Sequence, residues 1–167
     1  MDSYMDDIWS SLRLLLLLGV ANTTPLVAKR WFGAHWLAPL DGGLMFFDGR
    51  PLLGSSKTIR GLVAAVAATA LAALLLGLPA TVGALLGGGA MLGDALSSFI
   101  KRRMGAAPSS RATGLDQIPE ALLPLLVVKG VLGLTLVQIA GITLAFFVLE
   151  IPLAWLTHRI GLRDRPY

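Results

Sequence analysis

Four polar side chains recur at helical spacing inside one otherwise apolar stretch of the chain. Asp94, Ser97, Ser98 and Lys101 stand at positions i, i+3, i+4 and i+7, which places them on one face of an α-helix. An ionisable group in an apolar span is costly unless it meets water, a ligand or a partner. A carboxylate, two hydroxyls and a cation in this order suit a metal-bound polyphosphate. The structural alternative pairs Asp94 with a buried cation such as Lys129 and bonds the serines to backbone carbonyls.

The segment 48–61 combines glycines, hydroxyls and cations immediately before another apolar stretch. Its glycines allow the backbone to approach a ligand, and Lys57 and Arg60 place cations where the N-terminus of a helix already favours anions. We expect this segment to cradle phosphate. It is not a Walker A loop, because Ser56 occupies the place of that motif's second glycine. The simpler alternative is a capped helix start with ordinary cytoplasmic lysine and arginine beside it.

Two further acids, Asp116 and Glu120, stand where another helix is expected to begin. Acids at this position complement the helix dipole without any ligand. If this helix neighbours the one that carries Asp94, then Asp116 and Asp94 could share a divalent ion. Magnesium typically takes only one or two protein carboxylates and completes its shell with substrate phosphates and water.

Asn22 is a polar residue in the first apolar stretch, three positions before Pro25. Proline frees backbone carbonyls, and polar side chains beside it are kept away from lipid. Asn22 could therefore read a base edge or a lipid headgroup, or it could only satisfy the kinked backbone. The sequence leaves both alternatives open.

The composition excludes an ordinary soluble globule. Of 167 residues, 55% are apolar and only 14% are charged, against about 25% charged residues in soluble domains. The absence of cysteine excludes disulfides, thiolate metal sites and cysteine nucleophiles, and two histidines leave no histidine-rich metal cluster. The net charge of +4 comes from basic clusters beside apolar stretches, so we expect a membrane as partner and no nucleic acid.

The apolar stretches predict an all-α, polytopic integral membrane protein with five transmembrane helices in one catalytic domain over residues 1–167. A hydrocarbon core about 30 Å thick needs roughly 20 residues of helix. The first three predicted helices span 8–28, 59–78 and 81–100, the fourth begins near Gln117, the fifth ends near Thr157, and the turn between these two lies at 129–130 or 133–138.

The basic clusters also predict the orientation. They follow the first helix, precede the second, and follow the third and fifth, which puts the N-terminus outside and the C-terminus in the cytoplasm. Loops at about 29–58 and 101–116 then face the cytoplasm and carry the active site. A cleaved signal peptide over 1–21 is the alternative, but its n-region is acidic where a signal peptide needs positive charge.

Taken in order, the motifs resemble those of the CDP-archaeol synthases, archaeal relatives of the CDP-diacylglycerol synthases. The resemblance covers nearly the whole chain, and a Ser-x-x-Lys-Arg segment followed by a Leu-Asp pair is specific to that superfamily. The matching motifs are Ala21-Asn22-x-x-Pro25, Asp48-Gly49-Arg50, Leu53-Gly54-x-x-Lys57-Thr58-x-Arg60-Gly61, Gly93-Asp94, Ser98-Phe99-Ile100-Lys101-Arg102 and Gly114-Leu115-Asp116-Gln117.

The resemblance implies a Mg²⁺-dependent membrane enzyme that joins CTP to an unsaturated isoprenoid ether-lipid phosphate, giving a CDP-activated lipid and pyrophosphate. It implies that Asp94 and Asp116 hold Mg²⁺ and act in catalysis together with Lys101 and Lys57. The other residues that it implies in binding nucleotide or phosphate are Asn22, Asp48, Gly49, Thr58, Arg60, Ser97, Ser98, Arg102 and Gln117.

The chain departs from the superfamily pattern at two places. The Lys-Asp pair that the bacterial enzymes carry between their Lys-Arg and Leu-Asp segments is absent here. The second acid of the bacterial Leu-Asp-Arg-x-Asp run is Pro119 here, and Glu120 is the acid available to substitute for it. Two other functions stay open at this point. One is a CDP-diacylglycerol synthase acting on phosphatidic acid; the other is a small cation or proton transporter that uses Asp94 and Glu150 as a relay.

Overall fold

The computed structural model describes residues 2–107, 110 and 112–161, with side chains from residue 7 onward. The described chain folds into five helices without a β-strand, as expected for an all-α protein: α1 (Asp2–Phe32), α2 (Ile59–Leu75), α3 (Ala80–Arg103), α4 (Gln117–Leu132) and α5 (Leu136–Arg159). Arg111, Arg163 and Arg165, which contribute to the predicted basic clusters, lie outside the described residues.

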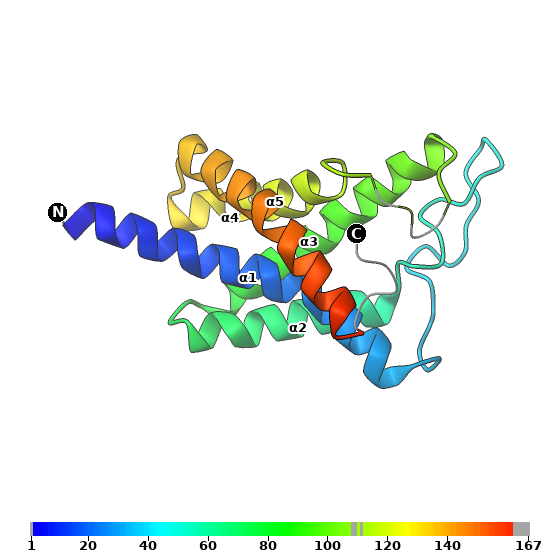
Figure 1. Cartoon of the computed structure of the whole chain (residues 1–167), viewed down its shortest axis with the longest axis horizontal. Coiled ribbons are helices and arrows are strands. Elements are labelled where there is room, and N and C mark those ends of the chain that lie inside the picture. The colour runs from blue at the N-terminus through cyan, green and yellow to red at the C-terminus, as the bar shows by residue number, and fades with distance from the viewer. Residues whose placement is uncertain (1, 108–109, 111, 162–167) are drawn as a thin grey trace.

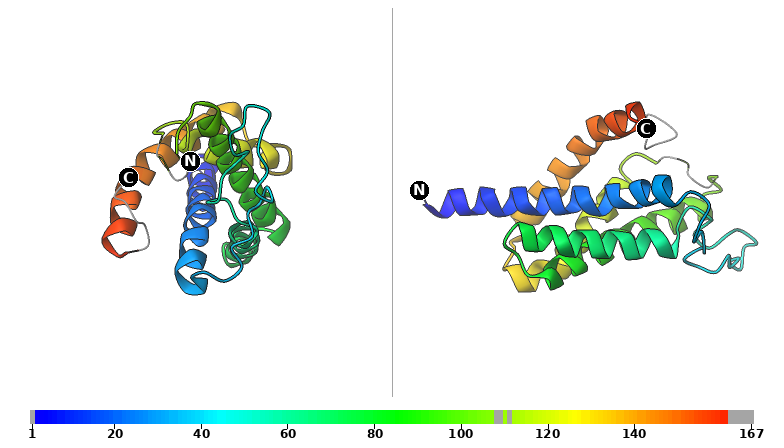
Figure 2. Two further views of the ribbon diagram at one scale, coloured as in Figure 1. Left: turned by 90° about the vertical axis from the view of Figure 1, so that its right-hand side faces the viewer. Right: turned by 90° about the horizontal axis from the view of Figure 1, so that it is seen from below.

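The helices run back and forth along one long axis (Figure 1). The segments 33–58 and 104–116 lie together at one end, which we call the loop end, and the short turns 76–79 and 133–135 lie at the opposite turn end together with the N-terminus. The helix α3 is central, because it packs against α1, α2 and α4. The helix α5 crosses the others obliquely (Figure 2).

Three helical segments are long and apolar enough to cross a membrane. They are Asp7–Phe32, Ala80–Arg103 and Leu136–Arg159, and α2 is a shorter apolar helix of 17 residues. Large apolar side chains face outward along all of them, among them Leu16, Leu75, Leu92 and Leu144. A soluble protein of this size would not leave so many leucines exposed, so these surfaces suit lipid.

The helix α1 is longer at both ends than the predicted span 8–28, and it runs without interruption through Pro25. Polar side chains beside the proline bond the helix itself: Asn22 Nδ2 donates to the carbonyl of Leu18 at 3.1 Å, and Thr24 Oγ1 donates to that of Val20 at 2.7 Å. This is the backbone-satisfying role that the sequence left open for Asn22.

The other helix ends differ from prediction by a few residues. The helix α2 ends at Leu75 rather than Leu78, because Gly77 adopts a left-handed φ of 74° and turns the chain. Between α4 and α5, the second of the two predicted turns is correct. Gly133 ends α4 with φ 64°, and Thr135 starts α5 in a reciprocal capping box with Gln138.

Glycines allow α3 to pack closely on both neighbours. A Cβ atom on Gly83 would lie 2.3 Å from the carbonyl oxygen of Thr69 in α2, and one on Gly93 would lie 2.2 Å from that of Pro119 in α4. Both distances are far below van der Waals contact. The small-residue spacing in the sequence is therefore a packing feature, as predicted.

Candidate active site

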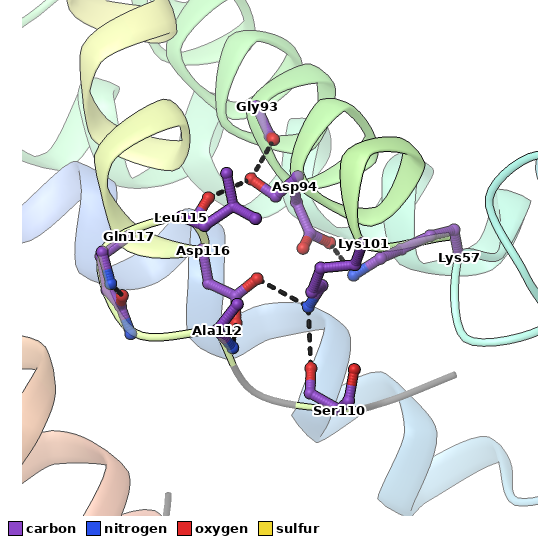
Figure 3. A network of polar contacts seen from close by, with 11 residues as sticks. Lys57, Gly93, Asp94, Lys101, Ser110, Ala112, Leu115, Asp116 and Gln117 are labelled. Atoms are coloured by element: carbon purple, nitrogen blue, oxygen red, sulfur yellow. Dashed lines mark hydrogen bonds and ion pairs between the residues drawn. The ribbon is translucent and has the colours of Figure 1, made fainter. Parts of the chain in front are cut away.

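Two ion pairs at the loop end of α3 form the centre of the site (Figure 3). Lys57 Nζ lies 2.5 Å from Asp94 Oδ2, and Lys101 Nζ lies 2.6 Å from Asp116 Oδ1. The four side chains are between 9% and 22% exposed. They are shielded enough for charge to act strongly, yet water still reaches them. The structure brings these four residues, all named from the sequence, together at the loop end of α3.

Local hydrogen bonds before and at the start of α2 position Lys57. Lys57 precedes α2, whose first turn is capped by Thr58 Oγ1 accepting from the backbone N–H of Gly61 at 3.2 Å. The Lys57 carbonyl accepts from the Leu40 N–H at 2.7 Å, which ties the segment before α2 to the rest of the 33–58 loop. Thr58 therefore starts the helix behind Lys57.

Ser97 connects α3 to the segment that carries Asp116. Its hydroxyl is fully buried and lies 2.6 Å from the carbonyl of Leu115 and 2.9 Å from that of Gly93. Asp116 is further held by the backbone N–H of Ala112 at 2.9 Å, and Gln117 Oε1 accepts from Gly114 N at 2.7 Å. Ser97 and Gln117 thus position the acid, and their own polar atoms bond backbone.

Arg102 is buried beside the ion pairs with unused hydrogen-bond donors. The residue is only 3% exposed, yet its Nε and Nη1 atoms have no hydrogen-bond partner. Asp116 is the opposite charge that acts on it. A buried guanidinium with free donors is costly. Bidentate binding of phosphate oxygens would satisfy such a group. Ser98, 3% exposed, lies in the same turn of α3.

Glu120 is a third acid at this end of the bundle. It is 8% exposed on the first turn of α4, and the backbone of that turn packs against Gly93, the residue before Asp94. The sequence named Glu120 only as a substitute for a missing acid. The approach of this turn to α3 depends on the close α3–α4 packing at Gly93, which no single-sequence pattern specifies.

The acids present fit a divalent cation that also binds substrate phosphates. The described part of the chain contains no group of three or more His, Cys, Asp or Glu residues that could hold a metal by itself. Mg²⁺ does not need one, since one or two carboxylates plus phosphates and water complete its shell.

Two predicted phosphate-binding residues point elsewhere. Arg60 Nη1 donates to the carbonyls of Gly33 and His35, at 3.1 and 2.6 Å, and so caps the end of α1. Asn22 Nδ2 bonds the carbonyl of Leu18 within α1. Neither side chain contacts the two ion pairs, because each donates to a backbone carbonyl elsewhere.

The predicted Asp48 and Gly49 belong to a clamp between the 33–58 loop and the end of α3. Gly49 makes the turn with a left-handed φ of 73°. Asp48 Oδ1 accepts from Arg103 Nη1 at 2.8 Å, and Arg103 stacks over the rings of Phe46 and Phe99. In addition, Arg50 Nη1 donates to the carbonyl of Arg103 at 2.5 Å. This clamp docks the loop onto α3 two residues beyond Lys101.

Sequence reasoning missed Asp41 as the organiser of the same loop. Its carboxylate accepts from the N–H groups of Gly43 at 2.9 Å, Leu53 at 2.8 Å and Gly54 at 3.4 Å. Burial raises the pKa of Asp41, but these backbone donors lower it by more, so the pKa lies below its ordinary value. The available signal was the Asp-Gly-Gly run at 41–43, which is typical of a side-chain-stabilised turn.

A hollow of about 240 Å³ lies within this loop and not at the ion pairs. Its lining residues include Pro39, Asp41, Met45 and Pro51, and none of the site lysines or acids. Pockets that enclose drug-sized ligands are generally about 300–1,000 Å³. We therefore assign the site from the convergence of charged side chains.

Comparison with known proteins gives the chain its family. A family model described as CarS-like, CDP-archaeol synthase, matches residues 5–82 and 78–167. The chain belongs to the CDP-archaeol synthase family. The CDP-archaeol synthase of Aeropyrum pernix is 35% identical over 99% of this chain and 96% of its own length. That of Methanopyrus kandleri is 42% identical over 74% of this chain and 73% of its own length.

A solved structure agrees with this membership. It is described as an intramembrane enzyme for archaeal membrane lipids biosynthesis, with a TM-score of 0.69 and 35% identity, over 85% of this chain and 90% of the solved one. As a member of the CDP-archaeol synthase family, the chain is a membrane-located, CTP-dependent cytidylyltransferase of archaeal lipid synthesis. The resemblance stated from the motifs is confirmed, and the transporter alternative is set aside.

Proposed function

We propose that this chain transfers a cytidylyl group from CTP to an unsaturated isoprenoid ether-lipid phosphate, in a Mg²⁺-dependent reaction that releases pyrophosphate. The observation that carries the site assignment is the convergence of Lys57, Lys101 and Arg102 around Asp94 and Asp116 at the loop end of α3. Three cations in one partly shielded place match a triphosphate, whose charge must be neutralised before a second phosphate can approach.

The side chains act by binding and orientation. Lys57 and Lys101, which reach the site from separate segments, neutralise phosphate oxygens from two directions. Arg102, with its two unbonded nitrogens, is the residue that we assign to a bidentate phosphate contact. A lipid phosphate is already ionised near neutral pH, so the reaction needs alignment with the α-phosphorus and no dedicated general base.

The acids hold the cation and complete the charge balance. Asp94 and Asp116, each now paired with a lysine, are the residues that we propose as Mg²⁺ ligands. When bound, the ion supplies charge stabilisation at the triphosphate. Ser97 fixes the distance between the two acids through its contact with the Leu115 carbonyl. Asp48 and Gly49 are assigned to positioning the loop, and Asn22 to bonding the α1 backbone beside Pro25.

We further propose that all five helices cross the membrane, with the loop end in the cytoplasm, where CTP is found. The N-terminus and the α2–α3 and α4–α5 turns then lie outside (Figure 1). The 17 residues of α2 span about 25 Å, at the lower limit for crossing the hydrocarbon core. Lys29, Arg30 and Arg159 at the ends of α1 and α5 agree with this orientation.

The test is a turnover assay with the purified chain in detergent. With CTP and Mg²⁺, the unsaturated ether-lipid phosphate should give CDP-lipid and pyrophosphate. Its saturated ether analogue and phosphatidic acid, offered separately, should be poorer substrates. Turnover with none of the three lipids by folded protein would contradict the proposal. A preference for phosphatidic acid would instead favour the CDP-diacylglycerol synthase alternative.

A further inference from the structure

All four tryptophans of the chain are exposed, and they lie near the two ends of the bundle. Trp9 is near the start of α1 and Trp31 near its end, while Trp36 follows α1 and Trp155 is in the last turns of α5. Trp9 and Trp31 are 22 residues apart on one continuous helix, or about 33 Å at 1.5 Å per residue. This length matches a hydrocarbon core about 30 Å thick, and tryptophan is enriched at both membrane–water interfaces.

Trp36 has a backbone conformation that a bulky residue rarely adopts. Its φ is 55°, and in the described part of the chain it is the one residue other than glycine with a positive φ. Glycine adopts this left-handed region without a steric penalty, whereas a large side chain there is an outlier. The ring is nevertheless 73% exposed, and within the protein it contacts the ring of Phe32 at 5.4 Å between centroids. Burial inside the protein therefore does not explain why tryptophan occupies this position.

Backbone contacts on both sides hold Trp36 in this conformation. Before it, the carbonyl of His35 accepts from Arg60 Nη1 at 2.6 Å. After it, the carbonyl of Ala38 accepts from the N–H of Ile59 at 3.0 Å. Strained conformations persist only where the surrounding structure over-determines them, and they cluster where function needs them. The start of α2 thus holds the exposed ring of Trp36 in place.

The segment 31–37 presents more large apolar side chains than Trp36 alone. Its exposed members are Trp31, Phe32, Trp36 and Leu37. Lys29 and Arg30 precede them in the last turn of α1. Exposed aromatic rings next to basic residues, at the end of a helix that is long enough to cross a bilayer, are typical of the headgroup layer. There the rings meet the acyl chains and the cations meet lipid phosphates.

We propose that the segment 31–37 is a membrane anchor, whose tryptophan rings insert into the headgroup layer at the loop end and hold the 33–58 loop against the bilayer. This inference rests on the proposed crossing of α1 and not on the roles proposed for the site residues. The anchor also couples Lys57 to the bilayer surface, because the Lys57 carbonyl accepts from the N–H of Leu40, three residues beyond the anchor, at 2.7 Å.

The test is tryptophan fluorescence in vesicles of phosphatidylcholine that is brominated on the upper part of its acyl chains. The changes Trp9→Phe, Trp31→Phe and Trp155→Phe leave Trp36 as the one fluorophore, and all three replaced rings are exposed, so the core keeps its packing. We expect brominated lipid to remove most of the emission seen in unbrominated vesicles, and iodide on both sides of the membrane to remove little. Brominated lipid is present in both leaflets, so the result does not depend on the orientation of the protein.

The matched control adds Trp36→Phe and Phe47→Trp to the same three changes, which moves the one fluorophore along the same loop. Phe47 is fully exposed, and the middle of the 33–58 loop projects beyond the helix ends (Figure 1). The control should be quenched by iodide and not by brominated lipid. If the background with three phenylalanines does not fold, the difference in quenching between the parent protein and Trp36→Phe gives the contribution of Trp36.

The quenching pattern decides the inference. Quenching of Trp36 by brominated lipid and of the control by iodide supports it. Quenching of both by iodide alone overturns it, and so does equal quenching of both by brominated lipid, because contact with the bilayer would then not be confined to 31–37. A further variant that keeps only Trp9 tests the crossing of α1. If brominated lipid quenches Trp9 but not Trp36, the anchor alone fails, and turnover in detergent tests the proposed reaction separately.

Discussion

At the scale of single residues, the proposed mechanism gives Lys57 and Lys101 the central electrostatic role. We expect Lys57→Gln and Lys101→Gln each to lower kcat about 10²- to 10³-fold, the loss typical of one preorganised donor at a charged transition state. Both lysines contact carboxylates at 2.5–2.6 Å. Their removal therefore also leaves an acid without its partner, which Tm measurements in detergent should detect.

The control for these variants is Lys29→Gln. Lys29 is an exposed lysine in the last turn of α1, at the same end of the bundle. This change should leave kcat within about twofold, because exposed charges contribute little. Comparable activity losses in all three variants would mean that the general positive charge of the loop end, and not the two assigned lysines, drives turnover.

Asp41 gives a prediction with a defined pH dependence. Because its folded-state pKa lies below the unfolded value of 3.8, the charged carboxylate stabilises the loop above that pH, and this contribution disappears as pH falls through the folded pKa. Asp41→Asn should lower Tm at pH 7 by less than about 4 °C, since the group is partly solvated. The difference from the parent protein should shrink as the pH of a series of thermal melts is lowered below 3.8. A pH-independent difference would contradict this role.

Helical spacing pointed to Asp94 and Lys101, because one face of a helix is a local feature. Lys57 and Asp116 were named from their places just before predicted helices and from the family resemblance. It could not identify the partners of Arg60 and Asn22. These partners are backbone carbonyls, such as those of Gly33 and Leu18, and a carbonyl carries no signal in the residue type. Long-range closure of the 33–58 loop decides that Arg60 caps the end of α1.

At the scale of helices, the packing of α3 against α4 can be tested by substituting one glycine of α3. In Gly93→Ala the new methyl group would lie 2.2 Å from the Pro119 carbonyl oxygen and 2.7 Å from the Glu120 nitrogen, both rigid backbone atoms. We expect a loss of about 1–3 kcal/mol in stability, as for other overpacked contacts, together with weaker metal binding as α4 moves away from Asp94.

The matched control is Gly88→Ala, on the same helix. A Cβ there meets only Val66 Cγ2 at 4.0 Å, so this variant should be neutral or slightly stabilising, since alanine favours helix. Tm and turnover of the two variants, measured side by side, check the prediction. Equal losses of Tm and turnover in Gly93→Ala and Gly88→Ala would contradict the prediction, because the effect would then not depend on contact with α4.

The helices themselves were predictable because apolar length and charge boundaries are local. All five exist near their expected positions, yet their ends moved by several residues. The early end of α2 follows from the left-handed Gly77, and the late end of α3 from capping by Arg50 across the loop. Gly77 is one of 19 glycines in the sequence, so its left-handed conformation has no clear signal there. The contact of Arg50 with the end of α3 is tertiary and has no local signal.

At the scale of the whole molecule, the proposed topology predicts opposite labelling of the two ends. The natural chain has no cysteine, so single cysteines report without background. In sealed vesicles of known orientation, Phe47→Cys, at a position that is 99% exposed in the loop, should react with impermeant maleimide only from the cytoplasmic side. Thr81→Cys, beside the α2–α3 turn, should react only from outside. Labelling of both from one side would contradict five crossings with this orientation.

Family membership and membrane location follow from composition, charge order and motifs that are read along the chain. The assembly of the site cannot be predicted in this way. It needs α2, α3 and α4 to bring together Lys57, Asp94 and Asp116, and the first and last of these are 59 residues apart in the sequence. The glycine-mediated contacts of α3 supply that approach, and they also bring the first turn of α4, which carries Glu120, against α3.

Anomalous diffraction from crystals of the chain grown with CTP and Mn²⁺ would locate the cation and the nucleotide directly. The proposed site predicts a manganese peak within coordination distance of Asp94 at the loop end of α3, with the triphosphate against Lys57, Lys101 and Arg102. A manganese–nucleotide complex bound elsewhere, with the Lys57–Asp94 and Lys101–Asp116 pairs undisturbed, would contradict it.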